Sequence, residues 1–181
     1  MVDVMVVVGS RHGATRGIGD RIAETLRAEG FVVGYYDAAE APSPQSARAV
    51  VIGGAAYMNK WVDEVPAYIR RHHAELAGRP VWLFSSGPVG TDKVDKQGRD
   101  VLAPPRFLTD AASDLGAQGT QVFFGRWDPD DPPTNIAERL FRMLPVSKEL
   151  LPIGDCRDWP ASEGWAREIA KELRAEPVAT A

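Results

Sequence analysis

The first half of the chain alternates between short β-branched runs and stretches in which apolar residues recur with helical spacing. Val4–Val8 is apolar at every position, which is typical of a strand buried on both faces of a sheet. Ile18, Ile22 and Leu26 follow at intervals of four and form the stripe of an amphipathic helix. Gly30 stands where the C-terminal cap of that helix would lie. The pattern predicts a buried strand, a loop and a helix.

The same alternation continues as far as residue 84. We expect strands at Phe31–Tyr36, Ala49–Ile52 and Val81–Phe84, because each is a short β-branched or aromatic run bounded by glycine, proline or polar residues. A single helix is expected between the third and fourth strands, and Gly78–Pro80 ends it. Its stripe consists of Val62, Val65, Ile69, His72 and Leu76.

The second half of the chain is less regular. Thr91–Arg106 is polar and contains glycine and proline, so we expect a loop there. Phe107–Leu115 has helical spacing, and Thr120–Phe124 reads as a fifth strand. We expect an irregular segment at Asp128–Pro133 and a helix at Ile136–Leu144. A last helix is expected at Ser162–Arg174, with Trp165, Ile169 and Leu173 facing inward. A flexible tail is expected after Glu176.

Strands that alternate with helices define an α/β fold in which a parallel sheet lies between two layers of helices. Right-handed crossovers place the carboxyl ends of all the strands at one edge of the sheet, where ligands bind in such folds. The loops after the first, third and fourth strands therefore carry the functional information. We predict one domain over residues 1–176, followed by a tail at 177–181.

Composition and charge narrow the function. A length of 181 residues suits one domain, and a formal net charge of −4 argues against a general nucleic-acid binder. The single cysteine, Cys156, excludes an internal disulfide framework and a cysteine-rich zinc site. No apolar run is long enough to cross a membrane, and the N-terminus lacks the features of a signal peptide, so we expect a cytoplasmic protein. Adjacent His72 and His73 would not share a helix face, so no metal site is expected.

The loop after the first strand has the composition of an anion site. Ser10–Arg16 contains two hydroxyl side chains, a central glycine and two arginines, and it leads into a helix. The free N–H groups and the dipole at a helix N-terminus attract a phosphate, and Ser10 and Thr15 can donate hydrogen bonds to it. A capped helix start without a ligand is the alternative interpretation.

Part of the same loop allows a different interpretation. Gly13–Gly19 resembles the glycine-rich NAD(P) loop of short-chain dehydrogenases, and Asp37 lies where an acid could hold a ribose. In that family the strand leads almost directly to the first glycine, whereas here four residues separate Val8 from Gly13. The Tyr-x-x-x-Lys pair of that family is also absent, since Tyr57 and Lys60 are only three apart. We therefore expect Gly17 and Gly19 to be small residues that let the helix pack closely on the sheet.

The three edge loops together resemble the FMN loops of the flavodoxin superfamily. They are Ser10–Thr15, where His12 replaces a hydroxyl residue of the phosphate motif, Gly53–Trp61 and Ser85–Gly90. Residues 53–65, 77–88, 123–126 and 156–170 resemble more closely the flavodoxin-domain family that includes the menaquinone-dependent protoporphyrinogen oxidases. The resemblance implies a flavodoxin-like three-layer sandwich, a five-stranded parallel sheet of order 2-1-3-4-5, and FMN as cofactor.

The resemblance also implies roles for individual residues. Tyr57 would stack on the flavin ring, and backbone amides of the second and third loops would reach the ring edge or the ribityl chain. Lys60 either stabilises negative charge on reduced flavin or is a solvated side chain, and Trp61 either completes the pocket or belongs to the core. The candidate cofactor-binding residues are Ser10, Arg11, His12, Gly13, Ala14, Thr15, Ala55, Ala56, Tyr57, Asn59, Lys60, Trp61, Ser86, Gly87 and Pro88.

Three functions remain open at this point. The first is an FMN-dependent oxidoreductase that resembles protoporphyrinogen oxidase, uses a quinone acceptor and contacts the inner membrane face peripherally. The second is a flavodoxin-type electron carrier with a protein partner, and the third is a flavodoxin-fold interaction domain without cofactor. A homo-oligomer is compatible with each. The cations available to an anionic substrate are Arg11, Arg16, Lys60, Lys93 and Arg126.

Overall fold

The computed structural model describes residues 2–57, 59–128, 130–131 and 154–175. Five parallel strands form its central sheet in the order β2-β1-β3-β5-β6, which confirms the predicted order when parallel strands alone are counted. The expectation of helices on both faces is likewise confirmed. The strands are β1 (Val2–Gly9), β2 (Val33–Asp37), β3 (Ala47–Tyr57), β5 (Val81–Ser86) and β6 (Gly119–Phe123).

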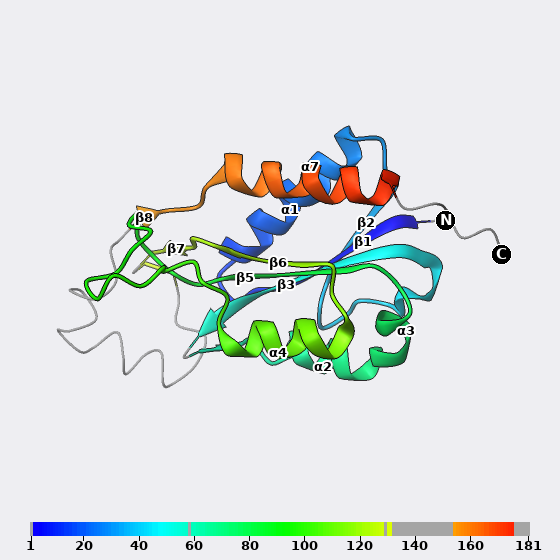
Figure 1. Cartoon of the computed structure of the whole chain (residues 1–181), viewed down its shortest axis with the longest axis horizontal. Helices are drawn as coiled ribbons and strands as arrows, with labels where there is room; N and C mark the ends of the chain where they lie inside the picture. The colour runs from blue at the N-terminus through cyan, green and yellow to red at the C-terminus, as the bar shows by residue number, and fades with distance from the viewer. Residues whose placement is uncertain (1, 58, 129, 132–153, 176–181) are drawn as a thin grey trace.

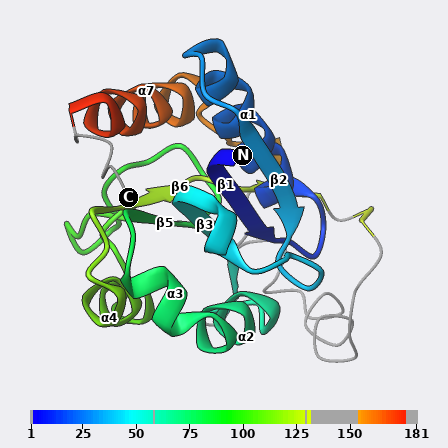
Figure 2. The same cartoon turned by 90° about the vertical axis from the view of Figure 1, so that its right-hand side faces the viewer.

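Two layers of helices cover the sheet (Figures 1 and 2). One face carries α1 and α7, and the other carries α2, α3 and α4. The loops that follow the strands gather at the end of the sheet opposite the start of β1 and the end of α7. The helices are α1 (Ala14–Ala28), α2 (Glu64–Arg71), α3 (His73–Ala77), α4 (Arg106–Leu115) and α7 (Trp159–Ala175), and the short elements are η1 (Pro44–Ser46), β4 (Lys60–Trp61), β7 (Arg126–Trp127) and β8 (Gly154–Asp155).

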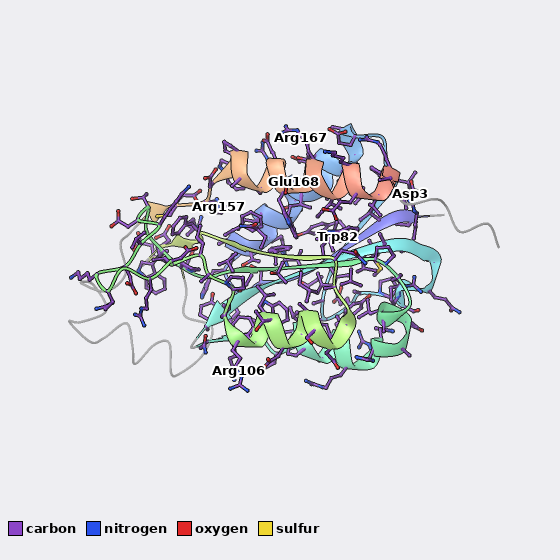
Figure 3. All side chains as sticks on the ribbon, viewed as in Figure 1. Asp3, Trp82, Arg106, Arg157, Arg167 and Glu168 are labelled. Carbon is purple, nitrogen blue, oxygen red and sulfur yellow. The ribbon has the colours of Figure 1, made fainter. Side chains whose placement is uncertain are left out.

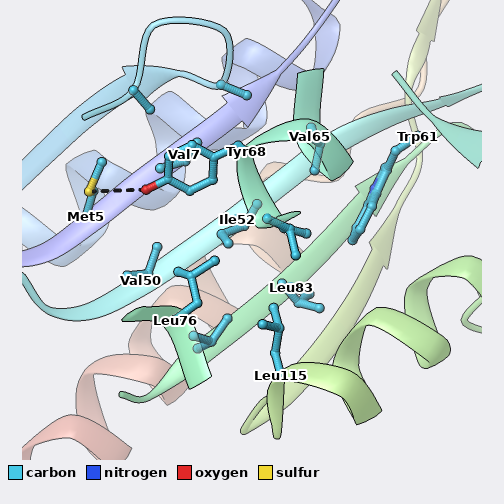
Figure 4. Packing of buried hydrophobic residues seen from close by; sticks show 14 of the residues in the cluster. Met5, Val7, Val50, Ile52, Trp61, Val65, Tyr68, Leu76, Leu83 and Leu115 are labelled. Atoms are coloured by element: carbon cyan, nitrogen blue, oxygen red, sulfur yellow. Dashed lines mark hydrogen bonds between the residues drawn. The ribbon is translucent and has the colours of Figure 1, made fainter. Parts of the chain in front are cut away.

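The core lies on both sides of the sheet because β1 is apolar on both of its faces. Val4, Val6 and Val8 point into the cluster under α1 and α7. Met5 and Val7 point into the cluster under the other helices, where the Tyr68 hydroxyl lies 3.8 Å from the Met5 sulfur (Figure 4). The apolar run Val4–Val8 is thus a strand buried on both faces, as predicted.

The helix predicted across residues 62–76 is two helices. Its break falls at His72, whose backbone leaves the helical region at φ −117° and ψ 21°. The His72 N–H still donates to the Tyr68 carbonyl and so closes α2. The His72 ring packs on Tyr68, and its Nδ1 lies 2.8 Å from Glu75 Oε2. These side-chain contacts hold the chain in a turn that an apolar spacing alone does not reveal.

Two predicted strand boundaries also need correction. The second strand begins at Val33 rather than Phe31, because the Val32 N–H donates to the Asp3 side chain and turns the chain there. The third strand continues to Tyr57 and forms an antiparallel pair with β4, where the sequence predicted only a loop. The expected helix at residues 136–144 and the expected tail at 177–181 lie outside the described residues. Within the described part of the chain, no helix has the length and apolar character needed to span a membrane.

Candidate functional site

The structure brings the three predicted loops together at the carboxyl edge of the sheet. β1, β3 and β5 are adjacent strands, and their pairing sets Gly9 opposite Gly54 and Ala55 opposite Ser86. The first loop therefore leaves the sheet beside the second, and the second beside the third. Each loop end is fixed by a buried strand and not by the loop's own composition.

A buried hydroxyl pair joins the first loop to the third. Thr15 Oγ1 and Ser86 Oγ are 2.7 Å apart, and the two residues are only 1% and 3% exposed. The sequence assigned the Thr15 hydroxyl to a phosphate. In the structure this hydroxyl is hydrogen-bonded to Ser86, and the bond fixes the position of the loop. Because both residues are buried, neither hydroxyl can replace this hydrogen bond by one to water unless the helix moves.

The N-terminus of α1 is open at the first loop. Gly13 is the N-cap residue at φ 77°, and within the described residues no side chain caps the helix. The first turn carries no acidic residue, and a Cβ built at Gly13 would meet nothing within 4 Å. The loop residues around it are at least partly exposed, except Thr15. An uncapped, positively polarised helix end beside open space suits an anion.

Gly17 and Gly19 do not face that opening. A Cβ on Gly19 would lie 2.5 Å from a Val8 methyl group, and one on Gly17 would lie 2.5 Å from Arg157 Nη1. Gly19 therefore lets α1 pack closely on the sheet, as the sequence predicted, whereas Gly17 makes room for the Arg157 side chain. Asp37, the candidate ribose ligand in the NAD(P) interpretation, instead accepts a hydrogen bond from Arg16 at 2.8 Å.

Tyr57 stands at the end of β3, between the first and second loops. It pairs with Lys60 across a tight turn in which Asn59 has φ 59°, a left-handed conformation that asparagine tolerates. The Tyr57 ring is partly buried, with the His12 ring edge-on at 6.5 Å between centroids. The guanidinium carbon of Arg11 lies over the Tyr57 ring, 5.1 Å from its centroid. Two side chains of the first loop thus contact the aromatic residue of the second.

Trp61 belongs to the hydrophobic core. It is 5% exposed and packs edge-on against Phe107 at 5.2 Å between ring centroids, beside Val65 (Figure 4). Its packing in the core is one of the two roles that the sequence left open. Lys60, by contrast, is exposed, and its Nζ lies 3.9 Å from Asp63 Oδ1.

The third loop packs against the second through Gly87. A Cβ built at Gly87 would lie 3.0 Å from the Ala56 carbonyl oxygen, so only glycine allows this approach without a shift. The Pro88 carbonyl accepts a hydrogen bond from the Gly125 N–H at 2.8 Å and ties the loop to the end of β6. Ala55 is buried and Ala56 is partly exposed. Small residues thus hold the two loops in contact along the edge.

Sequence reasoning did not identify Arg157 and Asp155, which brace the first loop from the far end of the chain. Arg157 lies at the end of the molecule where the loops gather (Figure 3). Its guanidinium forms a two-bond pair with Asp155, reaches the Ala14 carbonyl oxygen at 3.3 Å and lies over the Trp159 ring. Hydrogen bonds from the Arg157 side chain hold the pKa of Asp155 below its ordinary value. No local signal could reveal this contact, since Ala14 and Arg157 are 143 residues apart.

The paired histidines have separate partners. His72 bonds Glu75, and His73 Nε2 lies 3.0 Å from Asp114 Oδ2. A hydrogen bond from Ser43, and to a smaller extent one from His72, lowers the pKa of the Glu75 carboxyl. In the portion that the structure describes, no three histidine, cysteine or acidic side chains are grouped as metal ligands.

Comparison with known proteins identifies the family. A model of the flavodoxin domain matches residues 5–130, which is more than half of the chain, so the chain belongs to the flavodoxin domain family. This overturns the short-chain dehydrogenase interpretation. No curated protein matches the chain.

Several solved structures share the fold. A rubredoxin oxygen:oxidoreductase from Desulfovibrio gigas superposes with a TM-score of 0.61 at 15% identity, over 96% of this chain and 36% of that one. An archaeal flavodoxin gives 0.59 at 11% identity, over 94% of this chain and 99% of the flavodoxin. Flavodoxin 2 from Bacillus cereus gives 0.56 at 14% identity, over 94% and 99%. The chain spans about a third of the first protein's length and nearly all of each flavodoxin.

Proposed function

We propose that this chain binds FMN at the three edge loops and acts as an FMN-dependent oxidoreductase. One observation carries the proposal: the uncapped N-terminus of α1 and the partly buried Tyr57 ring lie side by side at the carboxyl edge. FMN combines an anionic phosphate with a flat aromatic ring system. A site for it needs an anion cradle next to an aromatic surface.

The described residues fit this cofactor. Ser10, Gly13 and the first backbone N–H groups of α1 would hold the phosphate, and Tyr57 would pack on the ring. Backbone groups of Ala56 and Gly87 lie where the second and third loops touch, and would line the ring edge. When bound, FMN supplies the electron transfer, and the protein supplies position and charge.

The finer proposal is an oxidase that resembles the protoporphyrinogen oxidases and passes electrons to a quinone at the inner membrane face. The sequence resemblance outside the three loops supports it. Two of the five cations considered for an anionic substrate are already paired, because Arg16 forms a salt bridge with Asp37 and Arg126 forms one with Asp131. Arg11, Lys60 and Lys93 are exposed and remain the candidates for this task.

A flavodoxin-type electron carrier is the second candidate. The match to nearly the whole length of two flavodoxins supports it, because a carrier needs little beyond the flavin domain. The acidic residues around Asp130 would offer a docking surface to a basic partner.

The first test is the visible spectrum of the purified protein before and after addition of FMN, with affinity measured by flavin fluorescence quenching. Gly13→Val should weaken FMN binding, because valine is strained at φ 77° and its side chain intrudes on the cradle. Gly30→Val is the matched control: Gly30 has φ 92°, faces open space and lies just past the other end of α1. Equal affinities for the two variants would refute the placement of the phosphate.

The second test separates oxidase from carrier. The FMN form is mixed anaerobically with protoporphyrinogen and then with a soluble menaquinone analogue. Reduction by the first and reoxidation by the second support the oxidase. Rapid reduction by a flavodoxin reductase, with none by protoporphyrinogen, would replace the oxidase by the carrier.

A further inference from the structure

Arg11 differs from the other arginines near the carboxyl edge. Arg16, Arg126 and Arg157 each hold an aspartate at 2.8 Å or less. Arg11 has no carboxylate partner among the described residues, and its recorded contact is the face of the Tyr57 ring. Within the described part of the chain, no salt bridge therefore compensates its positive charge.

The composition of the loops sharpens this contrast. Residues 9–16, 53–61 and 85–91 contain no aspartate or glutamate, whereas they carry Arg11, Arg16, His12 and Lys60. Arg16 is neutralised by Asp37, and the exposed Lys60 lies near Asp63. Among the charged residues of these loops that the structure describes, Arg11 is thus the one that lies over the Tyr57 ring.

We propose that Arg11 tunes the bound flavin, favouring its reduced, anionic form and so making the site an electron acceptor. This inference rests on the proposed FMN site. Addition of two electrons and one proton to FMN gives the ring system one negative charge. The oxidised ring is neutral, so a nearby guanidinium stabilises the reduced form alone. Only such differential stabilisation shifts a redox equilibrium.

The cation–π contact explains how the charge is kept in place. An arginine on a loop normally loses much of its effect to solvent and to its own mobility. The Tyr57 face attracts the guanidinium and orders it over the same side chain that would contact the flavin. Tyr57 therefore acts twice, as a ring surface for the flavin and as a support for Arg11.

The experiment measures the reduction potential of bound FMN by spectroelectrochemistry, together with the affinities for oxidised FMN and riboflavin. In Arg11→Gln, the preference for reduced over oxidised FMN should fall about tenfold, which for two electrons is a potential about 30 mV lower. Arg11→Lys keeps the charge and should recover most of this preference. Arg70→Gln removes the same charge from an exposed position at the end of α2 and should leave the potential unchanged.

Three outcomes would overturn the inference, and they can be told apart. An unchanged potential in Arg11→Gln, with FMN still bound, refutes the tuning role and leaves the FMN site intact. An equal loss of affinity for oxidised and reduced FMN, with riboflavin unaffected, makes Arg11 a phosphate ligand instead. If the wild-type protein binds no FMN, the proposed function fails, and the tuning role fails with it.

Discussion

At the residue scale, a single buried hydroxyl pair fixes the relation between two loops. Thr15 and Ser86 are separated by 71 residues but bond at 2.7 Å in an almost fully buried position. Removing either hydroxyl leaves the other without its partner in the interior, and such a loss costs about 1–3 kcal/mol. The pair thus joins the start of α1 to the end of β5 more firmly than a surface contact would.

A double-mutant cycle tests the pair. Thr15→Val and Ser86→Ala should each lower the free energy of unfolding by about 1–2 kcal/mol, and the double variant should lose less than the sum, with a coupling of about 1 kcal/mol. Urea denaturation of the four proteins measures these values. Additive losses would mean that the two hydroxyls do not depend on each other.

Tyr57 provides a second test at this scale. Tyr57→Ala removes the ring proposed to pack on the flavin and should weaken FMN binding by about 1–3 kcal/mol. Tyr57→Phe keeps the ring and serves as the control, with an affinity within about threefold of the wild type, or less than 1 kcal/mol. Fluorescence titration measures both. An FMN affinity that is unchanged in Tyr57→Ala would mean that the flavin ring does not pack on Tyr57.

At the element scale, β3 is the strand on which the site depends. It lies between β1 and β5 and carries Gly53 and Gly54 where the sheet approaches the edge. A Cβ on Gly53 would lie 2.0 Å from the fully buried Phe84 ring. A side chain at position 53 would therefore displace the Phe84 ring from its place on β5.

Gly53→Ala should lower the free energy of unfolding by about 1–3 kcal/mol, because Phe84 has to leave its position to admit the methyl group. Gly164→Ala is the matched control, since nothing lies within 4 Å of a Cβ at Gly164 in α7. It should stabilise the protein by about 0.5–1 kcal/mol through helix propensity. Thermal unfolding followed by circular dichroism compares the two, and a loss of equal size in both would contradict the packing argument.

At the scale of the whole molecule, the C-terminal part closes the fold over its beginning. α7 packs beside α1, and its Trp165, Ile169 and Leu173 enter the core, as the sequence predicted. Arg21 of α1 pairs with Glu163 of α7 at 2.9 Å. Arg157, held by Asp155, braces the first turn of α1. The anion cradle is thus supported by residues from the opposite end of the chain.

The pairing of Arg157 with Asp155 makes the stability of the fold depend on pH. The Arg157 hydrogen bonds lower the folded-state pKa of Asp155 below its ordinary 3.8, so its contribution is present above that value and is lost as the pH falls through the folded pKa. Asp155→Asn should reduce stability at pH 7 by about 0.5 kcal/mol, since the carboxylate is partly exposed. The gap from the wild type should shrink as the pH falls below about 4 in urea melts. A gap that is constant down to pH 3 would exclude this linkage.

The sequence alone determined the architecture, because each strand and helix carries its own periodicity. The all-apolar Val4–Val8 run required burial on both faces, and the spacing of Ile18, Ile22 and Leu26 required a helix next to it. Together with chirality, these local patterns place the three loops at one edge. The residue types in those loops then indicated an anion and an aromatic surface.

Only the tertiary structure decided which side chains meet at that edge. Thr15 is hydrogen-bonded to Ser86, Trp61 packs in the core, and Asp37 pairs with Arg16 and not with Arg11. The contact between Arg157 and Ala14 likewise has no trace in the local pattern. The spacing of apolar residues in a segment shows which of its faces meets the core and which meets solvent. The partner of a hydroxyl or a charge is set by distances between segments, and those exist only once the chain has folded.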